Sequence, residues 1–210
     1  MVNTFLVCTD YKESASYLDR QRLGKQRVEA YQILCLIEDL MYLSKRYKRP
    51  LPENPSKWKE WVRSIVKIYK KKDYKFTVEN GQYCKNDSSI TKFDLYEGER
   101  LVSLGFVYHP AVLMWIKWPD ALKLYINAHI EVWIERGYKN NMRIYDMEDN
   151  EVEHPPWIYN DDFHQNHRGA LIKKEIDRNE PKHYRKISIF KKAPKWKEYI
   201  WPLIEGKIKL

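Results

Sequence analysis

Residues 18–34 read LDRQRLGKQRVEAYQIL and place seven polar or charged side chains ahead of an apolar run. From residue 25 to about residue 47, apolar side chains recur at intervals of three and four, which predicts an amphipathic helix with one broad buried face. The side chains expected on that face are Val28, Tyr31, Leu34, Cys35, Leu40 and Met41. The polar beginning of the stretch carries more hydrogen-bond donors than a solvated helix start requires.

Other helical patterns follow. The prolines of KRPLPENPSKW, residues 48–58, end the first helix, and a second is expected over residues 56–72 with Ser56 as its N-cap. Pro110 and Pro119 suit the first turns of a short helix and a longer one. A last helix is expected from residue 163 to about residue 176, capped by one of the two aspartates before it.

These patterns predict an all-α fold. With only seven glycines among 210 residues, a turn-rich β fold is disfavoured. We expect a compact single-domain helical bundle over residues 1–210, with a short extended N-terminal segment and a basic insertion at about residues 45–100.

The charge pattern favours an anionic partner. The formal charge is +9, and residues 45–75 hold twelve Lys or Arg against three acidic residues. Residues 163–210 hold thirteen against five. Such basic blocks are typical of proteins that bind nucleic acid. No apolar run is long enough to span a bilayer, and three scattered cysteines indicate free thiols, so we expect a cytoplasmic or nuclear protein that does not act on membranes.

The polar start of the first helix is the first candidate site. At helical spacing, Arg22, Gln26 and Glu29 lie near one line, and Lys25 and Glu29 lie near another. The N-terminus of a helix also attracts anions, so the cluster is suited to hold a phosphate beside a carboxylate. Ordinary ion pairs on a solvated helix face explain the same pattern, and both readings stay open.

A second candidate lies in residues 161–174, DDFHQNHRGALIKK. His164 and His167 are one turn apart, but no third ligand is evident, so we expect no metal and no other cofactor. His109 directly precedes a helix and could cap it or reach a ligand. The side chains suited to phosphate contact are Arg168, Lys173 and Lys174. A solvated helix face is again the alternative.

Three blocks together resemble a known family. They are NTFL with SASYLDRQRLGKQRVEAYQIL within residues 3–34, YHPAVLMWIKWPDALKLYINAHIEVWIERGY at residues 108–138, and PPWIYNDDFHQNHRGALIKK at residues 155–174. In order and spacing they resemble small bacterial and viral proteins classed with the pyrimidine-dimer DNA glycosylases of the phage endonuclease V type. The resemblance implies a compact helical fold that removes a damaged base from DNA and then nicks the strand.

The resemblance also implies a mechanism. In the phage enzyme the α-amine of the mature N-terminus attacks the sugar C1′ and forms an imine, a glutamate on the first helix assists, and arginines hold the phosphates. Removal of Met1 would make Val2 the reacting amine here. The alignment places Gly24 where the phage enzyme has its glutamate, so Glu29, one turn further on, becomes the acid/base candidate. Lys25 is a substitute amine.

The first hypothesis is therefore a monomeric DNA glycosylase and abasic-site lyase acting on damaged or modified pyrimidines through an amine–sugar imine. Its expected catalytic residues are Val2, Glu29 and Lys25. Its expected phosphate or nucleic-acid contacts are Arg20, Arg22, Gln26, Arg27, His109, His164, His167, Arg168 and Lys173. A non-catalytic nucleic-acid-binding protein on the same scaffold is one alternative. An enzyme acting on nucleotides or on another modified base is the other.

Overall fold

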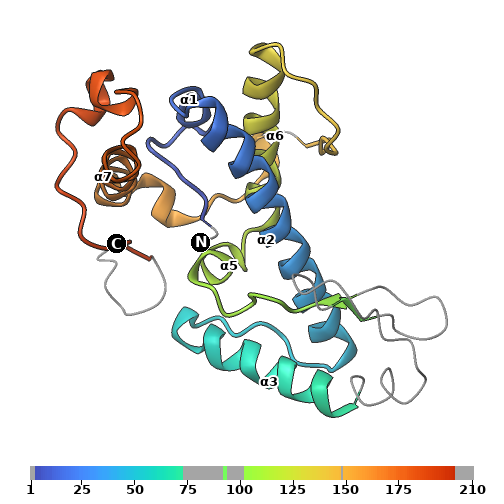
Figure 1. Ribbon diagram of the computed structural model, residues 1–210. Helices are drawn as coiled ribbons and strands as arrows, with labels where there is room; N and C mark the ends of the chain where they lie inside the picture. Colours follow the sequence, from blue (N-terminus) through green and yellow to red (C-terminus); the bar gives the residue numbers. More distant parts are fainter. Residues whose placement is uncertain (1–2, 73–91, 94–101, 148, 202–210) are drawn as a thin grey trace.

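The computed structural model describes residues 3–72, 92–93, 102–147 and 149–201, which form a helical body built on one long helix, α2 (Arg20–Arg46) (Figure 1). The other α-helices described are α1 (Tyr11–Ser16), α3 (Trp58–Lys72), α5 (Pro110–Trp115), α6 (Pro119–Glu135) and α7 (Asp161–Asp177). Short 3-10 helices span Pro55–Lys57, Asp149–Glu151, Pro156–Tyr159, Tyr184–Lys186 and Ser188–Phe190. The strands described, β1 (Lys92–Phe93) and β2 (Val102–Ser103), form one short antiparallel pair in which Lys92 lies opposite Ser103. The predicted all-α class is confirmed.

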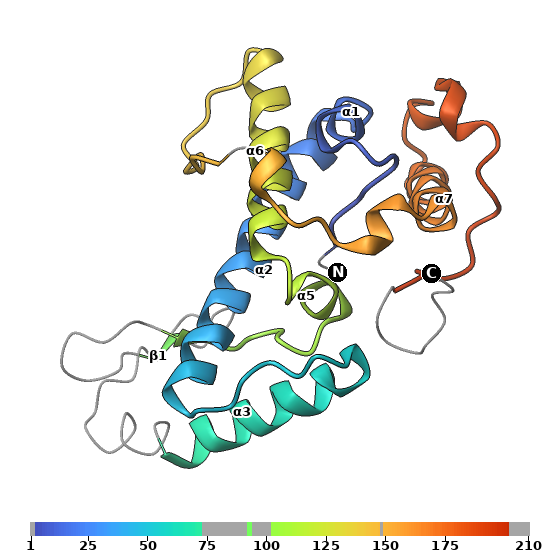
Figure 2. The same ribbon diagram turned by 180° about the vertical axis from the view of Figure 1, so that it is seen from behind.

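Helix α2 organises the other elements. Helix α6 packs along it, and α1 packs on α6, whereas α5 and α3 contact α2 further along. Helix α7 stands on the opposite side of the N-terminal segment, residues 3–7. In both views that segment runs through the space between α7 and the helices α1, α2 and α6 (Figures 1 and 2). The N-terminal end of the described chain therefore lies near the middle of the molecule, whereas the C-terminal end lies below α7 in both views.

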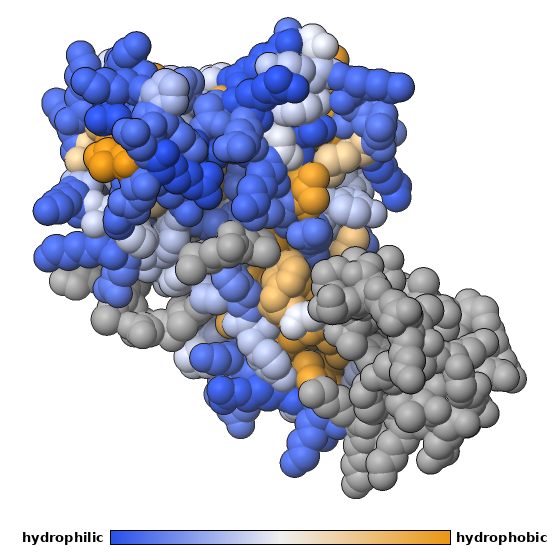
Figure 3. Space-filling view, viewed as in Figure 1, coloured by the Kyte–Doolittle hydropathy of each residue, from blue (hydrophilic) through white to orange (hydrophobic). Residues whose placement is uncertain are grey.

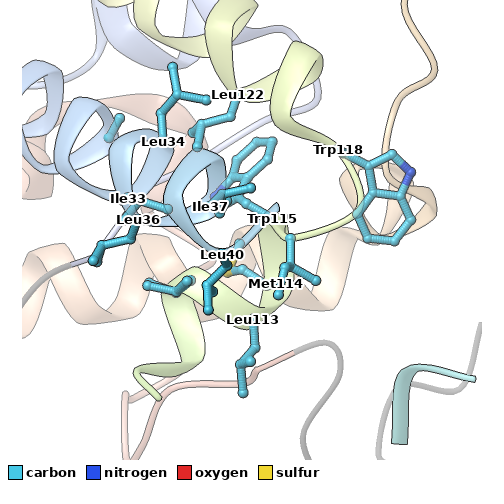
Figure 4. Packing of buried hydrophobic residues seen from close by; sticks show 14 of the residues in the cluster. Ile33, Leu34, Leu36, Ile37, Leu40, Leu113, Met114, Trp115, Trp118 and Leu122 are labelled. Carbon is cyan, nitrogen blue, oxygen red and sulfur yellow. The ribbon is translucent and has the colours of Figure 1, made fainter. Parts of the chain in front are cut away.

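The core lies between α2, α5 and α6. Figure 4 shows Leu34 of α2 beside Leu122 of α6, and Ile37 beside Trp115 of α5. Each of these four side chains is at most 1 % exposed. Burial of such side chains contributes about 1.5–3 kcal/mol each relative to exposure, so this interface fixes the angle between α2 and its neighbours.

Two expected caps are wrong by one or more positions. Asn160, and not Asp161 or Asp162, caps α7, because its side chain accepts hydrogen bonds from the two N–H groups that follow at its first turn. Before α3, Asn54 caps the 3-10 turn in place of Ser56. In both places an Asx residue sits just ahead of the expected cap and offers its oxygen to unpaired N–H groups.

The expected apolar face of α2 is only partly correct. Leu34 and Leu40 are buried, but Val28 and Tyr31 are 45 % and 42 % exposed. Helix α2 begins at Arg20 and is capped by Asp19. Near this end its buried face includes the polar side chains of Gln26 and Glu29. A strip of apolar side chains accordingly reaches the otherwise mainly hydrophilic surface in Figure 3.

The C-terminal tail crosses over α7. A Cβ atom on Gly169 would lie 2.6 Å from the carbonyl oxygen of Pro194, so the crossing requires glycine. Beyond the crossing, the ring of Tyr199 lies 6.3 Å from that of Phe5. The tail thus packs against the N-terminal segment.

Much of the expected insertion at residues 45–100 lies outside the described residues. Its described part contains α3, which buries Trp58, Trp61 and Ile65 against the body. The insertion and the single-domain organisation remain predictions. Among the described helices, none is both long enough and apolar enough to cross a membrane.

Candidate active site

Side chains from α2 and α6 hold the inner side of the N-terminal segment. The N–H of Phe5 donates to Gln26 Oε1 at 2.7 Å. The hydroxyl of Tyr125 lies 2.9 Å from the same oxygen and 3.0 Å from the carbonyl oxygen of Phe5. Both residues are buried, and burial raises the pKa of Tyr125 well above its ordinary value, so the phenol stays a donor. The Gln26 oxygen therefore holds the backbone of the N-terminal segment in place.

Helix α7 holds the outer side of the same segment. His167 Nδ1 accepts from the N–H of Leu6 at 3.0 Å, and Arg168 Nε donates to the carbonyl oxygen of Val7 at 2.7 Å. His164 places Nδ1 3.0 Å from the Leu6 oxygen and Nε2 2.7 Å from the Ile158 oxygen. Burial lowers the pKa of His164, while two carbonyl acceptors favour its protonated form. The structure thus places these three predicted site residues as anchors of the segment.

Glu29 lies where the segment begins. Its Oε2 accepts from the backbone N–H of Asn3 at 3.2 Å and from Gln26 Nε2 at 3.1 Å, and its Oε1 lies 3.5 Å from Lys25 Nζ. Glu29 is 7 % exposed, whereas the side chain of Lys25 is 60 % exposed. The carboxylate is therefore held by two N–H donors, with the exposed Lys25 ammonium on its solvent side.

A pocket of about 220 Å³ opens at this carboxylate. It is lined by Phe5, Gln21, Arg22, Lys25, Gln26, Glu29, Lys174 and Arg178. Four of these residues are cations and one is an acid, and the surface between α7 and α2 is hydrophilic in Figure 3. A pocket of this composition is suited to a small anion with a reacting centre beside a carboxylate.

Arg22 is the most firmly held of the pocket cations. One guanidinium nitrogen lies 2.6 Å from Asp19 Oδ2 and 2.8 Å from Glu180 Oε2. Burial lowers the pKa of Arg22, but the hydrogen bonds to the two carboxylates outweigh it and raise the pKa above its ordinary value. Arg178 pairs with the same Glu180 at 3.6 Å. This network joins α2 to the end of α7 and fixes the width of the pocket.

Other predicted phosphate contacts lie elsewhere. The Arg27 guanidinium stacks 3.9 Å from the centroid of Trp133, and Arg20 lies 4.8 Å from that of Tyr138. A Cβ on Gly24 would also meet Trp133, at 3.0 Å. Positions 20, 24 and 27 therefore face the end of α6 and not the pocket. A glutamate at position 24 would point away from the site, whereas Glu29 points into it.

Two other predicted residues that the structure describes, Lys173 and His109, do not line the pocket. Lys173 pairs with Asp177 at 2.7 Å on the solvated side of α7. His109 accepts from the N–H of Ala111 at 3.2 Å and so caps α5, and its ring lies against Trp201. Val2 lies outside the described residues. The sequence did not single out Arg178, although it follows Lys174 by one helical turn. Nor did it single out as site residues Asn3 and Tyr125, which are both buried.

The pocket at Glu29 is not the largest. Another of about 490 Å³ is lined by Thr9, Asp10, Tyr11, Lys12, Leu124, Asn127, Ala128, Glu131, Met147, His154, Ile158 and Tyr159. It contains none of the predicted site residues. Its single lysine, Lys12, is paired with two glutamates of α6. It therefore lacks the cationic character that a phosphate requires.

Two buried histidines near the site predict a loss of stability in acid. Burial lowers the pKa of His129 and of His167 to about 3, below the value of about 6.5 expected in the unfolded chain. The neutral forms are thus favoured in the folded state, and their contribution is present above pH 6.5 and lost as the pH falls towards 3. Between pH 7.5 and 5.5 the free energy of unfolding should fall by about 1.4 kcal/mol per histidine.

Urea denaturation at the two pH values measures this loss. The His129→Gln variant should lose about 1.4 kcal/mol of this pH dependence, because the contribution of one buried ring is gone. A wild-type unfolding free energy that is equal at pH 7.5 and 5.5 would contradict the assignment of both rings as neutral.

Comparison with known proteins identifies the family of the chain. No curated protein and no solved structure is similar enough to the chain to count as a match. Residues 2–146 match the family model described as pyrimidine dimer DNA glycosylase, which spans the N-terminal segment, α2 and α6, while α7 lies beyond it. Because this match covers more than half of the 210 residues, the chain belongs to the pyrimidine dimer DNA glycosylase family.

Proposed function

We propose that the protein is a DNA glycosylase and abasic-site lyase that acts on damaged pyrimidines, with the α-amine of Val2 as nucleophile and Glu29 as acid/base. Family membership supports DNA as the substrate and base removal as the reaction. The observation that carries the proposal is the hydrogen bond from the N–H of Asn3 to Glu29 at the mouth of a cationic pocket.

Covalent geometry supports the choice of amine. Residue 2 is joined to Asn3 by one peptide bond, and adjacent α-carbons are about 3.8 Å apart, so the proposed amine belongs to the residue next to the one that Glu29 binds. An α-amine has a pKa near 8 and is less protonated at neutral pH than a lysine near 10.4. It is therefore the better nucleophile at neutral pH. Lys25 is paired with Glu29 and is the weaker candidate.

The chemistry divides between the pocket residues. The amine attacks the sugar C1′, and the C1′–N bond to the base breaks with the bonding electrons leaving on the base. The C1′–O4′ bond then opens, the attacking nitrogen loses a proton, O4′ gains one, and the imine forms. Glu29 then accepts the C2′ proton, and the C3′–O bond breaks with release of the phosphate. Arg22, Lys25 and Arg178 neutralise the phosphate charge. The pocket volume of about 220 Å³ suits one sugar-phosphate unit, with the lesion base outside it.

Borohydride trapping on DNA that contains a pyrimidine dimer tests the proposal. Reduction of the imine should join protein and DNA, and mass mapping should find the adduct on the N-terminal peptide. A pure binding protein would instead bind DNA with steep salt dependence and leave the strand intact. An enzyme for free nucleotides would bind a mononucleotide as well as an oligonucleotide. Either result, with a free N-terminus verified, would overturn the proposal.

A further inference from the structure

Lys174 differs from the other cations of the pocket. Arg22, Lys25 and Arg178 each pair with a carboxylate, at 2.6, 3.5 and 3.6 Å respectively. Within the described part of the chain, no carboxylate lies within ion-pairing distance of Lys174 Nζ. The ammonium instead lies 5.9 Å from the ring centroid of Phe5, in the N-terminal segment. Among the described cations of the pocket, the Lys174 amine is therefore the one without an ion pair to a carboxylate of the protein.

The surroundings of Lys174 favour its neutral form. Burial lowers the pKa of this amine, and the charges of Arg178, Arg22 and Lys25 lower it further, while Glu29 acts in the opposite direction. A lysine desolvated beside other cations is a recognised way to obtain a reactive amine near neutral pH. The neighbouring Lys173 does not line the pocket and is paired with Asp177 on the solvated side of α7.

We propose that Lys174 is a second imine-forming amine of this pocket, which reacts with the C1′ aldehyde of abasic sites already present in DNA. The proposal rests on the proposed function only in placing a sugar-phosphate in the pocket. It adds an activity that does not require the N-terminal amine. The protein would then process abasic sites that arise independently of its own base removal.

Lys174 and Glu29 supply the nucleophile and the base for each step of the reaction. The Lys174 Nζ lone pair adds to the C1′ aldehyde carbon, and water leaves to give the imine. Glu29 accepts the C2′ proton, the C3′–O bond breaks, and the phosphate leaves with the bonding electrons. Water then hydrolyses the imine and frees the amine. The nearby cations offset the charge of the phosphate.

A lysine that only bound phosphate would behave differently on substitution. Arginine keeps the positive charge and binds phosphate well, but it stays protonated and forms no imine. The Lys174→Arg variant thus separates the two roles. Lys182→Arg is the matched control, because Lys182 is exposed and does not line the pocket.

The experiment uses the full-length protein and DNA carrying one preformed abasic site. Borohydride trapping followed by mass mapping should find an adduct on Lys174 in the wild-type protein. The Lys174→Arg variant should lose this adduct and nick the abasic site at least about tenfold more slowly, with an affinity for the DNA within about twofold of wild type. The Lys182→Arg variant should match the wild type. Adducts confined to the N-terminal peptide would overturn the proposal, whatever the behaviour of the variant.

The same assay on dimer-containing DNA separates this proposal from the proposed function. If dimer DNA is untouched while abasic DNA is trapped on Lys174, the glycosylase assignment fails and the Lys174 proposal stands. If dimer DNA is cleaved while abasic DNA is trapped through the N-terminus alone, the Lys174 proposal fails and the glycosylase assignment stands.

Discussion

The Glu29→Gln variant is expected to nick dimer-containing DNA about 10²–10⁴-fold more slowly than the wild-type protein, the range that general acid–base catalysis contributes. The amide cannot accept the C2′ proton. Its oxygen can still accept from the N–H of Asn3, so the N-terminal segment should stay in place. Single-turnover nicking, measured beside the dissociation constant, separates the two effects.

The matched control for this variant is Glu151→Gln, since Glu151 is exposed and distant in sequence from the pocket residues. It should nick at the wild-type rate. A Glu29→Gln protein that binds DNA normally and also nicks at the wild-type rate would exclude Glu29 as the acid/base.

A protein carrying Ser-Gly-Ser ahead of Val2 is expected to lose at least about 100-fold of its activity on dimer DNA. Three residues displace the terminal amine by up to about 10 Å, and even small displacements of a reacting group cost about two orders of magnitude in rate. Gel analysis of borohydride-trapped complexes measures the loss. The same extension placed after residue 210 serves as the control and should leave trapping unchanged.

The activity of the extended protein on abasic DNA is a second measurement. Nicking of abasic DNA should persist, because the side chain of Lys174 is not displaced by the extension. Wild-type activity of the extended protein on dimer DNA would show that the N-terminal amine is not the nucleophile.

Regular helices were predictable because their signals are local. Pro119 starts α6 where its fixed backbone angle suits a first helical turn, and the prolines after Lys48 end the first helix region. The start of α2 was placed five residues late, because the polar residues from Arg20 onward gave no apolar period. Their burial depends on the N-terminal segment, which only the tertiary structure places beside them.

The candidate site was predicted in part for the same reason. Helical spacing correctly grouped Arg22, Lys25 and Glu29 on one side of α2, since that grouping depends on geometry within one helix. It could not separate them from Arg27, which a long-range contact with Trp133 turns the other way. Nor could it select Lys174 over its neighbour, because only the packing of α7 on the N-terminal segment decides which lysine faces the pocket.

Two hydrogen bonds hold the N-terminal segment, residues 3–7, on α7, so this segment can be fixed in place only after α7 has been synthesised. Leu6 bonds to His167 across 161 residues of sequence, and Val7 bonds to Arg168 across the same separation. Contacts of such long range form late in folding. During synthesis on the ribosome, residues 3–7 emerge long before α7, so they gain these anchors only after α7 has formed. A chain that stops before residue 161 therefore lacks both of these hydrogen bonds, which hold the N-terminal segment on this side.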